Sequence, residues 1–232
     1  MHVHYHPSQN HGERVDGARV ELVVLHFTGM PDFDEARDRL CDAEAEVSCH
    51  YLIARDGGIF AMVREDRRAW HAGAGQWGGR DDVNSRSIGI EIDNDGQAPF
   101  AEAAIDSLIP LIEDILRRYH LGNEAVIGHQ CMAPERKSDP GPLFPWKRLA
   151  EANVAVWPDA PHAAPLAGAP ADRSHWLQFV EAARAFGYPV EVEAESLHRA
   201  FRNRFRGDDG YFDPMDTALM MDLARRFPAG RA

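Results

Sequence analysis

Val20-Glu21-Leu22-Val23-Val24-Leu25-His26 is the stretch that decides the fold. Its first six residues are mostly β-branched or aliphatic, and such a nearly continuous apolar run is typical of a strand buried on both faces. His26 stands at the end of this strand, and Gly29 and Pro31 break it. We therefore expect a buried strand that delivers an imidazole at its carboxyl end.

Further strands and helices are predicted on the C-terminal side of this stretch. Ser87-Ile88-Gly89-Ile90-Glu91-Ile92 places three isoleucines on one face of a strand, so Glu91 points to the other face. Residues 101–119 carry leucine and isoleucine at helical spacing, and Gly122 lies where a helix-ending C′ glycine would. The other expected elements are a helix at 34–44, a hairpin of strands 50–54 and 59–63, a long surface loop at 64–86, a strand at 125–127 and a short helix at 146–152.

Composition divides the chain into four parts. Residues 1–19 are polar and suggest an irregular N-terminal extension, whereas residues 20–152 carry the predicted sheet. Residues 153–173 are rich in alanine and proline, which is typical of a semi-rigid linker. Residues 174–232 are expected to form a separate small unit of three helices. The three helical faces are Trp176, Leu177, Val180 and Ala183, then Leu197, Phe201 and Phe205, then Ala218, Leu219 and Leu223.

The charge balance excludes some classes of partner. The chain has 232 residues, with 25 Lys+Arg against 37 Asp+Glu, and its formal net charge is −12. Sequence-independent binding to nucleic acid or to an anionic membrane surface requires basic surface, so we expect neither. No run of about 18 apolar residues is present, so no transmembrane helix is expected.

Cysteine usage and the N-terminal residues bear on location. Three cysteines are too few, and odd in number, for a disulfide framework, and they suit a reducing compartment. No basic residue precedes Arg14 and no apolar segment follows Met1, so we expect no secretory signal peptide and a cytoplasmic protein. A periplasmic location would follow if a signal peptide had been removed.

Two histidines and one aspartate follow separate predicted elements and form a candidate metal site. His26 ends one strand, His129 follows another short strand, and Asp139 lies in a proline-rich loop. Three protein ligands, with a fourth position left to water, are typical of catalytic zinc. Calcium would require more oxygen ligands, and softer metals would prefer cysteine. Cys131 lies close to His129 in the sequence and is an alternative ligand to Asp139.

Six segments follow the order of motifs in a known family. With these segments the chain resembles the type-2 N-acetylmuramoyl-L-alanine amidases, the AmpD/AmiD-like branch of the peptidoglycan-recognition fold. The resemblance implies an α/β fold with a mixed central β-sheet flanked by helices, followed by a small all-α domain of three helices. The segments are Leu25-His26-Phe27-Thr28, Ser48-Cys49-His50-Tyr51-Leu52-Ile53-Ala54-Arg55-Asp56-Gly57, Arg68-Ala69-Trp70-His71-Ala72-Gly73, Asn84-Ser85-Arg86-Ser87-Ile88-Gly89-Ile90-Glu91, Gly128-His129 and Arg136-Lys137-Ser138-Asp139-Pro140-Gly141-Pro142.

The resemblance also implies a role for individual residues. His26, His129 and Asp139 match the family's zinc ligands, which implies one Zn²⁺ per chain. Glu91 matches the carboxylate that takes a proton from the attacking water and passes it to the leaving nitrogen. Lys137 matches a lysine that stabilises the developing oxyanion.

Two further observations concern the same site. Only two of the 25 Lys+Arg residues are lysines, Lys137 and Lys147, which adds weight to a specific role for the lysine near Asp139. Trp70, His71 and Asn84 lie in the predicted long loop, and we expect them to line the substrate groove.

The function implied is hydrolysis of the lactyl amide bond between N-acetylmuramic acid and the L-alanine of the stem peptide. The expected partners are muropeptides, in particular the 1,6-anhydro form, and also the intact sacculus.

One alternative is a recognition protein of the same fold that binds peptidoglycan without cleaving it. Such proteins lose a metal ligand or the base, and here none is lost. A zinc hydrolase of another amide is a second alternative. We expect a monomer.

The C-terminal region resembles the small three-helix peptidoglycan-binding domain that often follows this amidase domain. The residues that fit that pattern also have the spacing of a helical core, so two interpretations stay open: the region binds the cell wall, or it docks on the first unit and stabilises it. The residues are Leu177, Gly187, Tyr188, Phe201, Phe205, Thr217 and Leu219.

Overall fold

A computed structural model describes residues 2–159, 170–208 and 210–229. Its centre is a six-stranded sheet that is parallel except at one pair, the antiparallel β4 and β5. The sheet is therefore mixed, as the resemblance implied. Across the sheet the strands are β1 (Val3–Tyr5), β5 (Ile59–Ala61), β4 (Tyr51–Ile53), β7 (Ser87–Ile92), β3 (Leu22–Phe27) and β8 (Val126–Gly128).

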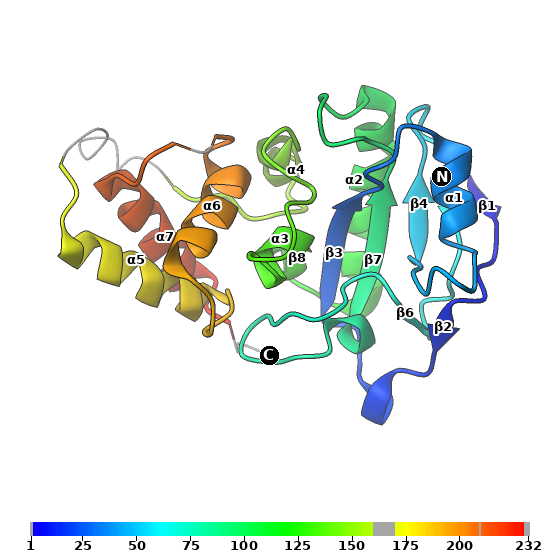
Figure 1. The fold of residues 1–232 in the computed structure, drawn as a ribbon, viewed down its shortest axis with the longest axis horizontal. Coiled ribbons are helices and arrows are strands. Elements are labelled where there is room, and N and C mark those ends of the chain that lie inside the picture. Colours follow the sequence, from blue (N-terminus) through cyan, green and yellow to red (C-terminus); the bar gives the residue numbers. More distant parts are fainter. Residues whose placement is uncertain (1, 160–169, 209, 230–232) are drawn as a thin grey trace.

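The apolar stretch at residues 20–26 contributes the buried strand β3, between β7 and β8 (Figure 1). One face of the sheet packs against α2 (Glu102–Tyr119), which confirms the amphipathic helix. The alternation in β7 is also confirmed, because its isoleucines lie in this core with alternate residues of β3. The core beneath α2 includes Val23, Leu25, Ile88, Ile90, Ile92, Leu108 and Ile112.

The other face of β3 belongs to a second core, which it shares with the C-terminal helices. Leu22 and Val24 lie in one cluster with Phe179, Phe186 and Phe201. Figure 1 shows these helices beside β8, with α3 (His129–Met132) and α4 (Trp146–Glu151) between them and the rest of the sheet. The helical region is therefore joined to the first part of the chain by a continuous apolar core.

Three C-terminal helices form as expected: α5 (Arg173–Phe186), α6 (Ala194–Phe205) and α7 (Pro214–Arg226). Asp172 and Asp213 begin α5 and α7 with capping boxes. The predicted face of α5 is wrong in part, because Leu177 is exposed whereas Phe179 is buried. Phe179 is one of the aromatic residues that join the shared core, so the packing of the other helices decides which face is buried.

Residues 2–19 are only partly irregular, which corrects the expectation for the N-terminal extension. Strand β1 pairs in parallel with β5, and β2 (His11–Gly12) pairs antiparallel with β6 (Arg68–Ala69). Ser8 and Asn10 are buried and hydrogen-bond to Leu40, Asp42 and Val47, which lie 32 to 37 positions away in the sequence. Such pairing leaves no periodic hydrophobic signal in the sequence, because it is carried mainly by backbone and polar groups.

Several boundaries also differ from expectation. The helix expected at 34–44 is the shorter α1 (Phe33–Arg39), and the left-handed residue that ends α2 is the C-cap His120 rather than Gly122. The segment 64–86 is not wholly a surface loop, because it holds β6 and a short 3-10 helix, η2 (Val83–Arg86), whose residues are buried. Further 3-10 turns are η1 (Val15–Gly17) and η3 (Asn123–Ala125).

Part of the expected linker at 153–173, residues 160–169, lies outside the described residues. Among the described parts of the chain, none of the helices has both the length and the apolar character needed to cross a bilayer.

Candidate metal centre

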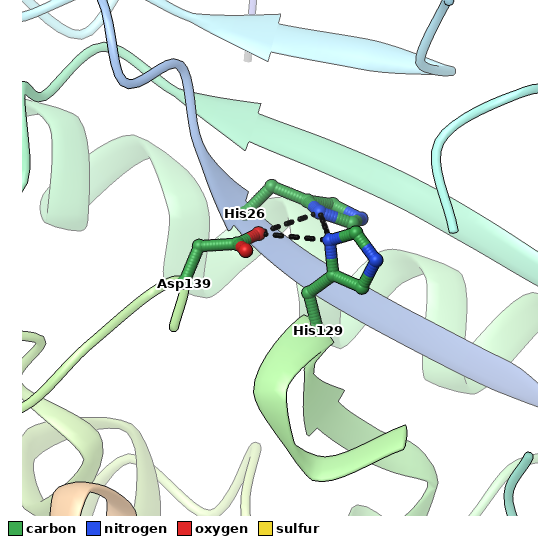
Figure 2. Close-up of side chains that lie close together, drawn as sticks. All are labelled: His26, His129 and Asp139. Atoms are coloured by element: carbon green, nitrogen blue, oxygen red, sulfur yellow. Dashed lines mark hydrogen bonds and ion pairs between the residues drawn. The ribbon is translucent and has the colours of Figure 1, made fainter. Parts of the chain in front are cut away.

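His26, His129 and Asp139 converge at the carboxyl edge of the sheet, where β3 and β8 end side by side (Figure 2). His26 lies near the end of β3, and His129 is the first residue of α3, directly after β8. The two Nδ1 atoms are 3.0 Å apart, and Asp139 Oδ2 lies 2.9 Å from His26 Nδ1 and 3.1 Å from His129 Nδ1. All three side chains are buried.

This donor set fits a divalent metal ion. Donor atoms about 3 Å apart match a tetrahedral ion with bonds of about 2.0–2.1 Å, and two imidazoles with one carboxylate are ligands that zinc accepts. Burial, followed by repulsion from His129, lowers the pKa of His26 to about 4. Burial alone would raise the pKa of Asp139, but the neighbouring side chains of His129 and His26 outweigh it and hold that pKa well below its usual range. A neutral His26 and an ionised Asp139 are the protonation states that metal binding requires.

Cys131 is not part of this group. Its sulfur lies 3.9 Å from the Tyr188 hydroxyl and 3.6 Å from an Arg204 guanidinium nitrogen. The spacing in the sequence left the choice between Asp139 and Cys131 open. The geometry favours Asp139, because it is Asp139 that lies with the two histidines. Cys131 instead contributes to the core shared with the C-terminal helices.

A cavity of about 290 Å³ opens in front of the three donor atoms. Glu91, Lys137 and Trp70 line it together with the candidate ligands, so the structure brings together most of the residues that the sequence singled out. A second depression of about 410 Å³ adjoins it and is also lined by Trp70 and Lys137. Trp70 and Lys137 thus face both hollows, which is the place expected of groups that contact a substrate.

Glu91 stands beside His26 because the two are register partners on β7 and β3. Its Oε2 is buried and has no hydrogen-bond partner among the described residues. Burial, together with repulsion from Asp139, raises the pKa of Glu91 well above its ordinary value, and Lys137 acts in the opposite direction. A half-buried carboxyl with a buried, unpaired oxygen and a raised pKa is typical of groups that exchange protons with a reactant.

His71 and Asn84 lie behind the candidate ligands and are buried. His71 Nδ1 is 3.0 Å from His26 Nε2, and Asn84 Oδ1 accepts hydrogen bonds from the backbone N–H groups of His71 and Ala72. The Ala72 carbonyl oxygen lies 2.8 Å from His129 Nε2. His71 also lines both hollows, and Asn84 lines the second.

Sequence reasoning missed Ser87, whose hydroxyl lies 3.1 Å from His71 Nε2, and Gly89, which lies beneath the His71 ring. A signal was present, because the alternation in residues 87–92 that separates Glu91 from the isoleucines also puts Ser87 and Gly89 on the Glu91 face. Their partner His71 could not be inferred, since it comes from a non-periodic segment.

Comparison with known proteins agrees with this geometry. A family model described as N-acetylmuramoyl-L-alanine amidase matches residues 16–142. The N-acetylmuramoyl-L-alanine amidase AmiD of Escherichia coli (strain K12) is 39% identical in an alignment of length 211, which covers 81% of this chain and 75% of AmiD.

Two solved structures with ligands are similar over nearly the whole chain. AmiD from E. coli, in complex with the substrate anhydro-N-acetylmuramic acid-L-Ala-D-gamma-Glu-L-Lys, has a TM-score of 0.80 and 34% identity, covering 96% of this chain and 93% of that one. AmpDh3 from Pseudomonas aeruginosa, in complex with anhydromuramic pentapeptide, has a TM-score of 0.78 and 34% identity, covering 97% of both chains. The similarity therefore includes the C-terminal helices.

Proposed function

Because the chain belongs to the N-acetylmuramoyl-L-alanine amidase family, we propose that it hydrolyses the lactyl amide of 1,6-anhydro muropeptides with one zinc ion held by His26, His129 and Asp139. The bond cleaved joins N-acetylmuramic acid to the L-alanine of the stem peptide. The observation that carries the proposal is the convergence of three buried donor atoms on the cavity that Glu91 lines. The anhydro sugar is proposed because both ligand-bound relatives hold anhydromuramyl peptides.

The metal and the chain's own residues would divide the chemistry. When bound, zinc supplies a Lewis acid that lowers the pKa of a coordinated water to about 7 and polarises a carbonyl group. The two imidazoles and the Asp139 carboxylate would hold the ion with one position left for a reactant. The three side chains are buried and already converge without a substrate, so little rearrangement would be needed when one binds.

Glu91 would carry the proton. Its buried Oε2 would accept a proton from the attacking water and then donate it to the alanine nitrogen as the amide C–N bond breaks. The raised pKa of Glu91 suits this task, because the protonated form must persist long enough to protonate the leaving group. The products would be the anhydromuramyl moiety and a stem peptide with a free amino group.

Lys137 would stabilise the charge that develops on the carbonyl oxygen. It lines both hollows beside the candidate ligands, and it is only half-buried, so its ammonium group is accessible to a substrate. A compact ammonium directed at one oxygen supplies electrostatic stabilisation that is strongest in the transition state. Trp70, in the wall between the hollows, would contact the bound muropeptide.

Two further features bear on the compartment and the oligomeric state in which this activity would occur. Cys41, Cys49 and Cys131 are all free thiols, which suits a reducing compartment, and we propose that the protein acts in the cytoplasm on small muropeptides. All the proposed site residues come from one chain, so a monomer with one zinc ion would suffice.

The C-terminal helices are proposed to stabilise the amidase region rather than to act as a detached wall-binding unit. They share a core with β3, and Arg204 of α6 donates a hydrogen bond of 2.8 Å to the Val126 carbonyl in β8. Sedimentation of the intact protein with purified sacculi tests wall binding. Retention in the pellet at physiological salt would contradict a purely stabilising role.

The experiment for the activity is mass spectrometry of products from an anhydromuramyl tripeptide. Release of anhydro-N-acetylmuramic acid and the free tripeptide is expected, with loss on chelation and recovery on adding zinc. Stoichiometric zinc binding without cleavage would instead support a recognition protein of the same fold. Cleavage that chelation leaves unchanged would exclude the metal-dependent mechanism.

A further inference from the structure

We propose that the dipeptide His71-Ala72 orients both histidine ligands, and that Ser87 fixes the tautomer of His71, so that His26 and His129 each present an Nδ1 lone pair to the metal. These are positioning residues, which act through the ligands. The inference rests on the proposed metal centre and gives His71 and Asn84 a task other than the substrate contact expected from the sequence.

The first arm of this arrangement is a chain of hydrogen bonds to His26. The Ser87 hydroxyl has one proton and donates it to the Val83 carbonyl at 2.6 Å. Ser87 Oγ must therefore act as the acceptor at 3.1 Å from His71 Nε2, which places the ring proton of His71 on Nε2. A neutral imidazole has a single N–H, so His71 Nδ1 is an acceptor.

The proton on His26 follows from this order. His71 Nδ1 lies 3.0 Å from His26 Nε2, and only a proton on His26 Nε2 completes this hydrogen bond. His26 Nδ1 is then left without a proton, facing Asp139 and His129. The Val83 carbonyl fixes the direction of the hydrogen bonds through Ser87 and His71. This direction selects the tautomer of His26 that can bind the metal.

The second arm reaches His129 directly. Its Nε2 lies 2.8 Å from the carbonyl oxygen of Ala72, which can only accept. The proton of His129 is therefore on Nε2, and Nδ1 is free for the metal. The neighbouring residues His71 and Ala72 thus hold the two ligands. His71 holds His26 through its side chain, and Ala72 holds His129 through its backbone carbonyl.

The dipeptide itself is fixed from two sides. Asn84 Oδ1 accepts from the N–H groups of His71 and Ala72 at 3.0 and 2.8 Å. Gly89 makes room for the ring, since a Cβ there would lie 2.3 Å from His71 Cγ. Ser87, Gly89 and Glu91 alternate along one face of β7, so a single strand supplies the hydrogen-bond anchor, the space for His71 and the proposed base.

Removing the Ser87 hydroxyl is expected to weaken metal binding. In Ser87→Ala, His71 loses the acceptor for Nε2–H and is free to place its proton on Nδ1, opposite His26 Nε2. His26 would then be driven to carry its proton on Nδ1, where it competes with the metal. Loss of such outer partners typically costs about 10–100-fold in metal affinity, and that range is expected here.

The control is Ser85→Ala. Ser85 is as buried as Ser87, but its hydroxyl accepts from Val15 N and Arg68 Nε and does not contact His71. Zinc affinity is measured by competition with a chromophoric chelator, and folding by far-UV circular dichroism. A weaker affinity in Ser87→Ala, with Ser85→Ala unchanged, supports the inference, and equal affinities overturn it. If the unmodified protein binds no zinc, the proposed function itself fails.

A second measurement needs no variant. ¹⁵N–¹H correlation spectra of the imidazoles in the zinc-loaded protein report which nitrogen carries the proton. The expected result is an Nε2–H tautomer for His26, His71 and His129. An Nδ1–H tautomer at His71 overturns the proposal, whatever the Ser87 variant does.

The position of the dipeptide is tested at Asn84. Asn84→Asp keeps an oxygen acceptor for the N–H groups of His71 and Ala72 and should retain the wild-type tautomers. Asn84→Ala removes this acceptor from both N–H groups and should lower the zinc affinity. Equal affinity in the two variants would show that Asn84 does not hold the segment.

Discussion

His26 and Glu91 are register partners on the adjacent parallel strands β3 and β7, so their side chains leave the sheet on the same face. Neighbouring strands lie about 4.8 Å apart, which places the proposed base next to a proposed ligand without the help of any loop. The preceding pairs on this face are Val24 with Gly89 and Leu22 with Ser87. Strand pairing therefore sets the geometry of both the site and its support.

Replacing Glu91 with glutamine should abolish most turnover while leaving the metal in place. Glutamine has nearly the same shape but cannot accept the proton of the attacking water, and loss of general acid–base catalysis typically costs about 10²–10⁴-fold in rate. The measurement is kcat with zinc content determined on the same sample. Glu124→Gln, at an exposed position, is the control, and near-wild-type turnover in Glu91→Gln would disprove the assignment.

Lys137→Ala should lower kcat by about 10²–10³-fold, which is the usual effect of losing one group that stabilises an oxyanion. The chain offers a matched control, because its other lysine, Lys147, is exposed and its one ion pair within the described part of the chain is with Glu151, at 3.9 Å. Steady-state kinetics on the anhydromuramyl tripeptide distinguish the two. A similar kcat for both variants would remove Lys137 from the mechanism.

Zinc should stabilise the folded protein, because the three ligands converge only in the native state. At a free zinc concentration 100 times Kd, the gain is about 2.7 kcal/mol. Calorimetric melting with and without zinc should show this shift in the wild type and a much smaller one in Asp139→Asn, which lacks the anionic ligand. An equal shift in both proteins would place the ion elsewhere.

His50 should make the metal-free protein less stable in acid. Its Nδ1 accepts from Gly89 N at 2.9 Å, and burial lowers the pKa of His50 to about 4 from its ordinary 6.5. The unfolded ring takes up a proton below about pH 6.5 and the native ring only below about pH 4, so stability falls as the pH falls through this window. The loss is roughly 3 kcal/mol at 1.36 kcal/mol per pKa unit.

Urea unfolding of the wild type and His50→Asn, from pH 7 to pH 4 in chelator, tests this linkage. Asparagine keeps an acceptor near the position of Nδ1 but does not titrate, so the wild-type advantage in unfolding free energy should shrink as the pH falls. A constant difference between the two proteins would mean that His50 is not the group responsible.

Arg204→Met should destabilise the whole chain in one transition. The guanidinium donates to the Val126 carbonyl and lies 4.5 Å from the centre of the Trp146 ring, so its loss leaves a buried acceptor unpaired, at a cost of about 1–3 kcal/mol. Circular dichroism and tryptophan fluorescence should give coincident urea transitions. Separate transitions would indicate that the helices fold apart from the sheet, and Arg225→Met, at an exposed site, should behave as wild type.

The sequence by itself determined the position and type of the elements that have a strong hydrophobic pattern, and it identified the residues that follow them. The apolar run of β3, the alternation of β7 and the helical spacing of α2 were each sufficient, because burial of one face imposes a pattern within the element. The candidate ligands His26 and His129 followed from their positions after predicted strands, the motif resemblance favoured Asp139 over Cys131, and the geometry brings the three together.

Only the tertiary structure decided what depends on contacts between distant segments. The pairing of β1 with β5, the exposed position of Leu177 and the place of His71 over Gly89 leave no periodic trace in the sequence. His26 and His129 are 103 positions apart, and their Nδ1 atoms meet only because β3 and β8 pair in register. The hydrophobic pattern within an element determines which of its faces is buried. Strand register and packing between elements determine which atoms of different elements meet.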